Sequence, residues 1–218
     1  MMHLSSTIQL LCASLIGVSV IWMQLVKKNT TLVQAYVLQS VGLIVLLGME
    51  VYSQMSMGLL LVTVAMFVIK VIVAPTLFTR LIHTSHQNLS ATTYLNIPMT
   101  LVVLLGLVAF AQSDILAPIF PLIAQTSPLR MILIGAILMS MFLIINRKGA
   151  LSQIIGVLSL ENAVFTFGIF LSVKELPALE MGILFDVFFW IVISSIFANM
   201  IYRNFGSFDI SKLNQLRK

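Results

Sequence analysis

The chain has 218 residues, of which 60% are hydrophobic and only 9% are charged, and its mean hydropathy is +1.09. About a quarter of the residues of a soluble domain are charged, so this composition excludes a soluble globule of this size. The net charge of +5 does not indicate a nucleic-acid-binding protein, because the basic residues stand between apolar runs and form no basic face.

The inventory of metal-binding side chains is small. One cysteine and three histidines exclude an iron–sulfur cluster and speak against a structural zinc site. We therefore expect no metal ligands and no cofactor-binding residues.

Continuous apolar runs predict an all-α, polytopic transmembrane bundle of about seven helices. In hydrocarbon every backbone polar group needs an internal partner, which leaves helices or a closed barrel, and the runs are too long for the alternating strands of a barrel. At about 20 residues per span, the expected helices are 5–26, 32–52, 57–82, 97–113, 129–146, 150–173 and 178–202.

Individual elements carry further expectations, taken in chain order. The first run lacks a basic n-region and an obvious cleavage site, so it is interpreted as a membrane helix and not as a signal peptide. Cys12, within it, is expected to be a small packing residue. Pro75 removes a backbone donor and is expected to kink or break the third helix. The longest connection, 114–128, is rich in proline and contains an apolar stretch that we expect at the membrane interface.

The distribution of basic residues predicts the orientation. Nine lysines and arginines lie in the odd-numbered connections and the tail, against two on the opposite side. Because basic residues are retained in the cytoplasm, the amino terminus is expected outside and the carboxyl terminus in the cytoplasm.

Three ionisable residues stand within expected spans: Lys70 in the third, Glu161 in the sixth and Asp186 in the seventh. A charge at the bilayer centre costs about 2.5–3.5 kcal/mol even on a lenient scale, so each must face protein, water or another charge. At 1.5 Å per residue, Lys70 lies about 18 Å and Glu161 about 17 Å from the cytoplasmic face, so the two can meet if their helices are neighbours. These residues are candidate proton-relay groups, because burial disfavours the charged forms of amine and carboxyl alike. The alternative is a purely structural ion pair.

The sequence resembles hydrogenase-4 component E, a membrane subunit of formate hydrogenlyase and related group 4 nickel–iron hydrogenases. The resembling pieces are Ile69-Lys70-Val71 with Pro75, Leu160-Glu161-Asn162, Glu180-x-Gly182 with Asp186, and the tail from Gly206 to Leu213. The last three spans, 129–202, are similar to the small three-helix membrane subunit of respiratory complex I. Glu161 matches the first embedded glutamate of that subunit, whereas Asp186 stands where the second would be.

The resemblance implies a division into a four-helix membrane segment (1–128), a three-helix module (129–202) and a cytoplasmic tail (203–218). It implies a non-catalytic subunit of a proton-translocating, hydrogenase-type oxidoreductase complex in the inner membrane of a prokaryote. The implied partners are antiporter-like and quinone-site-like membrane subunits, peripheral iron–sulfur and nickel–iron hydrogenase subunits, and lipid. Two alternatives stay open: a subunit of a multi-subunit cation/proton antiporter, and a purely structural membrane scaffold.

Overall fold

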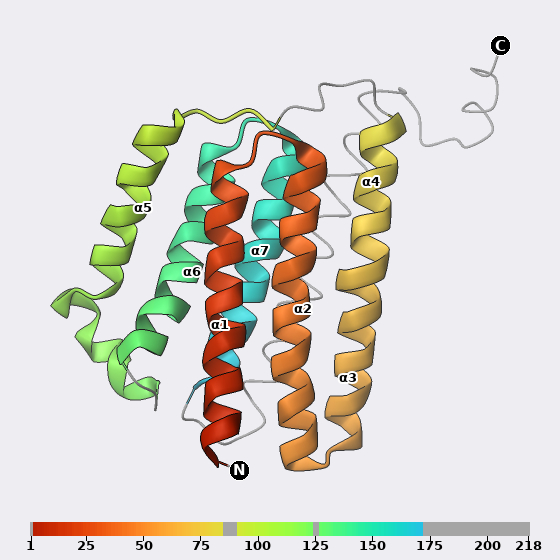
Figure 1. The fold of residues 1–218 in the computed structure, drawn as a ribbon, viewed down its shortest axis with the longest axis vertical. Coiled ribbons are helices and arrows are strands. Elements are labelled where there is room, and N and C mark those ends of the chain that lie inside the picture. Colours follow the sequence, from red (N-terminus) through yellow and green to blue (C-terminus); the bar gives the residue numbers. More distant parts are fainter. Residues whose placement is uncertain (1, 85–90, 124–126, 172–218) are drawn as a thin grey trace.

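The structure is a computed structural model that describes residues 2–84, 91–123 and 127–171. Apart from short connections and two isolated β-bridges, the described residues are helical (Figure 1). In chain order, the elements are α1 (Met2–Leu25), α2 (Asn29–Gln54), α3 (Met57–Phe67), the π-helical segment η1 (Val68–Val73), α4 (Ala74–Thr84), α5 (Ile97–Ala111), the 3-10 helix η2 (Asp114–Leu122), α6 (Ser127–Asn146) and α7 (Ala150–Ile169). Within these described ranges, five helices are long and apolar enough to cross a membrane, or six if α5 and η2, bent by 55°, count as one span.

Six of the seven expected helices correspond to observed ones. The expected helix at 178–202, and with it Asp186, lies outside the described residues. Pro75 is expected to kink or break the third helix. A break is wrong, because the helix runs without interruption over Met57–Arg80. The backbone hydrogen bonding changes from the α-helical to the π-helical pattern over Val68–Val73, just before Pro75, and the helix continues.

Local sequence accounts for several helix ends. The Ser56 side chain accepts from the Leu59 N–H at the start of α3, and Asn96 accepts from the Met99 N–H at the start of α5. Each side chain satisfies one of the backbone donors that a helix start leaves without a partner. Met55 closes α2 in a left-handed conformation with φ of 51°, which turns the chain directly into α3.

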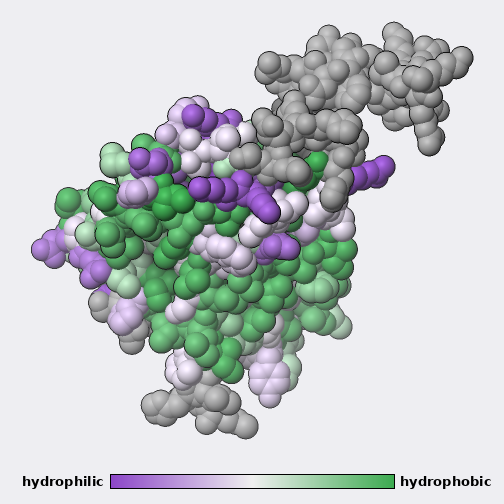
Figure 2. Space-filling view, turned by 45° about the horizontal axis from the view of Figure 1, so that its top comes forward, coloured by the Kyte–Doolittle hydropathy of each residue, from purple (hydrophilic) through white to green (hydrophobic). Residues whose placement is uncertain are grey.

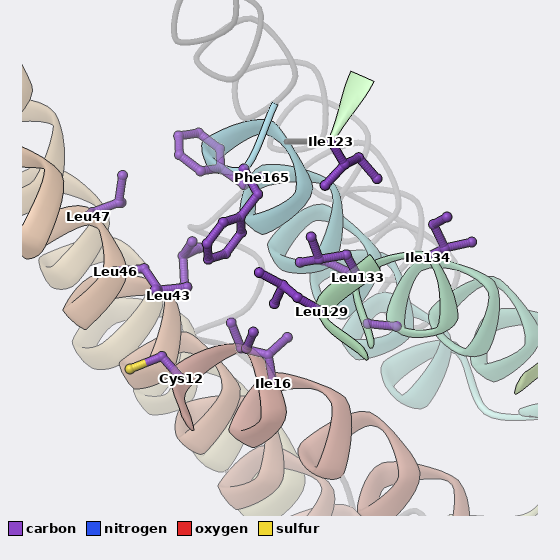
Figure 3. Close-up of a cluster of buried hydrophobic side chains, with 14 of the residues drawn as sticks. Cys12, Ile16, Leu43, Leu46, Leu47, Ile123, Leu129, Leu133, Ile134 and Phe165 are labelled. Carbon is purple, nitrogen blue, oxygen red and sulfur yellow. The ribbon is translucent and has the colours of Figure 1, made fainter. Parts of the chain in front are cut away.

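The bundle is built around α1, α2, α6 and α7, which pack against one another, with α3 and α4 beside α2 and α5 beside α6 (Figure 1). Two apolar clusters fill it. The first apolar cluster includes Cys12, Leu43, Leu133 and Phe165, and Figure 3 shows these side chains converging between the helices. Cys12 is thus the packing residue that the sequence predicts. The second apolar cluster lies further along the same helices.

The members of the second apolar cluster come from the opposite halves of α1, α2, α6 and α7, from α4 and α5, and from the residue that follows α1: Val20, Met23, Val26, Leu32, Val33, Ala35, Tyr36, Ala74, Phe78, Ile82, Leu104, Met139, Leu143, Ile154, Ile155 and Leu158.

The outward faces of α3 and α5 remain apolar. Leu61 and Val64 on α3 and Val102 and Leu105 on α5 are each more than half exposed. Hydrophobic side chains cover the flank of the molecule, and hydrophilic ones gather toward one end (Figure 2). In water such a surface would be unfavourable, so its natural surroundings are lipid or other membrane proteins.

The α1–α2, α4–α5 and α6–α7 connections meet at one end of the bundle, which we call the connection end (Figure 1, top). Ala91 N–H donates to the Lys27 carbonyl at 2.7 Å, and Tyr94 N–H donates to the Asn146 carbonyl at 2.9 Å. Thr93 and Arg147 form an isolated antiparallel bridge. The sequence places the first, third and fifth connections on the same side of the membrane. In the structure these three connections lie together at one end of the bundle (Figure 1).

Candidate functional site: a buried ion pair in a polar layer

A layer of polar side chains separates the two apolar clusters. Along α2, α7 and the helix that contains η1, the layer falls between residues of the first cluster and residues of the second, and on α6 Ser140 adjoins Met139 of the second. Its members are at most 2% exposed: Gln39, Ser40, Lys70, Ser140, Ser159, Glu161 and Asn162. We call these seven residues the polar layer. Their helices, α2, η1, α6 and α7, bring them together at mid-height in the bundle.

Lys70 and Glu161 form the ion pair at the centre of this layer. The Lys70 ammonium contacts the Glu161 carboxylate, and it also donates to the Asn162 side-chain carbonyl at 3.0 Å. Lys70 is 0% and Glu161 is 2% exposed. The pair brings together the third and sixth expected spans, at the common depth that counting residues predicts.

Lys70 lies in the π-helical segment. Ala74 N–H donates to the carbonyl of Ile69, five residues back, where an α-helix would use the residue four back. Pro75 follows at once and has no N–H to offer. The wider turn therefore absorbs the missing donor without breaking the helix. It also carries the buried positions Met66, Lys70 and Ala74 to the inward face. Single π-helical turns of this kind are frequent at functional sites.

Asn162 connects the ion pair to the rest of the layer. Its side-chain nitrogen donates to the Ser40 hydroxyl at 3.0 Å and lies 3.5 Å from the Gln39 side-chain oxygen. Gln39 in turn donates to the Ser159 carbonyl at 3.2 Å. The Ser159 hydroxyl lies 3.0 Å from the Ser140 hydroxyl. These hydrogen bonds link η1, α7, α2 and α6 at one level of the bundle, although the Ser159 backbone carbonyl bonds to Gln39 and its hydroxyl bonds to Ser140.

This arrangement can hold charge where an apolar core cannot. Burying a lone ion in such an interior would cost roughly several kcal/mol of hydration free energy. The mutual attraction of Lys70 and Glu161 and the dipole of the Asn162 amide offset that cost. A carboxylate so placed can accept a proton and become neutral, which changes the net charge of the pair by one unit.

Of the three sequence-predicted relay residues, Lys70 and Glu161 are in contact. Asp186 lies outside the described residues. Gln39 and Asn162 belong to the polar layer, where the sequence alone leaves open whether such amides line a hydrated path or tie helices together.

Sequence reasoning missed Arg147, which it counts among the cytoplasmic basic residues. Arg147 is 0% exposed. Its guanidinium donates to the Val26 carbonyl at 2.9 Å, to the Ala91 carbonyl at 3.0 Å and to the Met23 carbonyl. Burial lowers the pKa of Arg147 to about 10, so the group stays charged at physiological pH. It joins all three connections and places a positive charge at the negative end of the α1 dipole.

Comparison with known proteins finds distant relatives. No protein-family model and no solved structure matches the chain. Over 160 residues the chain is 23% identical to hydrogenase-4 component E of Escherichia coli K12, and to the same component of Shigella flexneri. This covers 73% of this chain and 74% of theirs. It is also 29% identical over 83 residues to an uncharacterized protein of Mycobacterium tuberculosis, covering 38% of each chain. The comparisons thus support a distant relationship to hydrogenase-4 component E, a name that denotes one component of a larger assembly.

Proposed function

We propose that this chain is a non-catalytic membrane subunit of a hydrogenase-type complex, in which the polar layer carries protons across the interior of the bundle. The observation that carries the proposal is the buried Lys70–Glu161 ion pair, set between two apolar clusters. A stability device alone does not need such a pair, because well-packed apolar residues of similar volume are often as stabilising. The distant similarity to hydrogenase-4 component E supports the part of the proposal that assigns the chain to a hydrogenase-type complex.

Within this proposal Glu161 takes and releases the proton. When the carboxylate is neutralised, Lys70 loses its counter-charge and can favour a carboxylate elsewhere. We propose Asp186, in the expected helix 178–202, as the next carboxyl group of the relay. The division into residues 1–128, 129–202 and 203–218, with a complex-I-like middle module, belongs to the same proposal. So do the antiporter-like, quinone-site-like, iron–sulfur and nickel–iron partner subunits, and a location in the inner membrane of a prokaryote.

The decisive experiment replaces Glu161 by Gln in the assembled complex. The amide keeps the shape and a hydrogen-bonding oxygen but cannot exchange a proton at neutral pH. We expect electron transfer to continue while proton translocation into membrane vesicles, followed with a pH-sensitive dye, is lost. Glu50→Gln is the matched control, because Glu50 lies near the end of α2 and hydrogen-bonds its neighbours Ser53 and Gln54. Unchanged translocation by an intact Glu161→Gln complex would make the pair structural.

Assembly separates the remaining alternatives. Native gels of solubilised membranes should show the chain in a large complex together with hydrogenase subunits. Migration of the chain by itself would contradict the proposal. Comigration with antiporter subunits and no hydrogenase would instead identify a multi-subunit cation/proton antiporter.

A further inference from the structure

Gln24, near the end of α1, is a buried amide with one half of its hydrogen bonding unaccounted for. It is 3% exposed, and its nitrogen donates to the Met139 carbonyl at 2.9 Å. Its side-chain oxygen accepts from none of the described residues. A buried acceptor without a donor is unfavourable, and proteins usually meet such a need with an internal water. Gln24 therefore marks a place where water is favoured inside the bundle.

Gln24 lies beside the polar layer. Met139, which accepts its hydrogen bond, is the residue before Ser140 on α6. The Ser140 and Ser159 hydroxyls are 3.0 Å apart, and either can be the donor. A hydroxyl pair that can reverse its direction is what proton transfer through side chains requires, since each oxygen must donate forward and accept from behind.

Gln24 also lies beside the connection end. The preceding residue, Met23, offers its carbonyl to Arg147. Arg147 Nε is a buried donor for which the described part of the chain supplies no acceptor. Lys27 and Lys28, a few residues on, are exposed. A water-seeking acceptor and a water-seeking donor thus lie at the same end, between the exposed surface and the polar layer.

We infer that a hydrated route leads from the connection end past Gln24 to the Ser140–Ser159 hydroxyl pair and on to Glu161. This inference rests on the proposed function, whose proton it delivers. Water passes a proton to a serine hydroxyl, which releases its own proton to the next oxygen. Because residues two apart on a helix do not face each other, water completes the last step from Ser159 to the Glu161 carboxylate, which becomes a neutral carboxyl group. Each hydroxyl ends with the number of protons it began with. No oxidant or reductant takes part.

Single cysteines test the hydration directly. In a Cys12→Ala background, Ser140→Cys and Ser159→Cys are near-isosteric changes within the route, and Gln24→Cys probes its entrance. Ser19→Cys is the matched control, because Ser19 is equally buried but its hydroxyl bonds to Leu15 of its own helix. The assembled complex in membranes is treated with a small, water-soluble methanethiosulfonate reagent. Modification needs a thiolate, which forms only in contact with water.

We expect the cysteines at 140 and 159 to react at least about tenfold faster than the cysteine at 19, as hydrated thiols do relative to thiols in an apolar setting. Equal rates at all three positions would overturn the route and leave the serines as ties between helices. The outcome is independent of ion coupling. If Glu161→Gln abolishes translocation while the serine positions stay unreactive, the proposed function stands and the route fails. If the serine positions react but Glu161→Gln has no effect, the route stands as hydration and the proposed function fails.

Discussion

Lys70 and Glu161 both give up hydration on entering the bundle, and the structure offsets that loss with their contact and with the Asn162 carbonyl. The energetic weight of such a pair is asymmetric. Replacing both charges by apolar groups of similar size is often neutral, whereas removing one leaves the other buried and without its counter-charge. Stability does not require the two charges, whereas proton transfer does require the Glu161 carboxylate. Substitutions of the two residues can therefore separate the effect on stability from the effect on proton transfer.

Lys70→Met is expected to lower the free energy of unfolding by about 3–5 kcal/mol, because Glu161 would keep its burial and lose its counter-charge. The double variant Lys70→Met, Glu161→Gln should recover more than half of that loss. Thermal unfolding in detergent, compared at one protein concentration, measures both. A double variant no more stable than Lys70→Met would contradict the view that the pair stands near energetic balance.

Arg147→Lys is expected to lower the free energy of unfolding by about 1–3 kcal/mol, since a single ammonium cannot reproduce the planar fork that reaches Val26, Ala91 and Met23. The same thermal measurement applies. Lys28→Ala is the control, because Lys28 is exposed and should change stability by less than about 0.5 kcal/mol. Equal effects of the two substitutions would show that the buried contacts of Arg147 contribute little.

The sequence predicts the depth of a charged residue but not its partner. Counting residues along two spans brings Lys70 and Glu161 to one level, whereas helix adjacency comes from tertiary packing that hydropathy does not encode. Arg147 shows the converse. It stands beside Lys148 in a short connection, and nothing local tells the buried guanidinium from the exposed ammonium. Its acceptors are carbonyls more than 50 residues away.

At the scale of elements, α6 and α7 approach each other closely at Gly156. A Cβ there would lie 3.0 Å from Ile144 Cγ1 and 3.2 Å from the Ile144 backbone nitrogen. Gly156→Ala is expected to separate the two helices and to cost about 1–3 kcal/mol. Gly106→Ala in α5 is the control, because a Cβ there meets no described atom within 4 Å. Thermal unfolding compares the two. A Gly156→Ala protein as stable as the control would mean that α6 shifts at no cost.

Helix positions were predictable to within a few residues, because an apolar run of membrane-spanning length has no other stable conformation in lipid. The predicted break at Pro75 failed for a specific reason. Proline removes one donor, but the π-helical turn directly before it shifts the hydrogen bonding, as the bond from Ala74 N–H to the Ile69 carbonyl shows, and the helix continues past Pro75 to Thr84.

For the whole molecule, the gathering of three connections at one end makes the membrane orientation testable. Lys27, Lys28 and Lys148 are exposed there, so this end is expected in the cytoplasm. The substitutions Lys148→Cys and Met55→Cys, each in a Cys12→Ala background, test this orientation. In intact cells a membrane-impermeant thiol reagent should not reach the thiol of Lys148→Cys, because that position would face the cytoplasm, but it should modify Met55→Cys. Met55 is 80% exposed at the opposite end. The reverse pattern would invert the topology.

The overall architecture was predictable as a helical membrane bundle, and the clustering of odd-numbered connections followed from their basic residues. Two things were not. The division of the interior into two apolar clusters by one polar layer needs the lateral order of the helices. Which outward faces meet lipid and which meet other subunits depends on partners, and the apolar surfaces of α3 and α5 suit both.

The π-helical turn bears on how chain length can vary in this protein. Such a turn holds one residue more than an α-helical turn, so Val68–Val73 contains a surplus position. Loss of one residue there would leave a regular α-helix, with the buried faces of α3 and α4 still pointing into the bundle. Loss of one residue elsewhere in Met57–Thr84 would instead rotate one half by about 100° relative to the other. Among related sequences, single-residue gaps in this helix are therefore expected to fall beside Lys70.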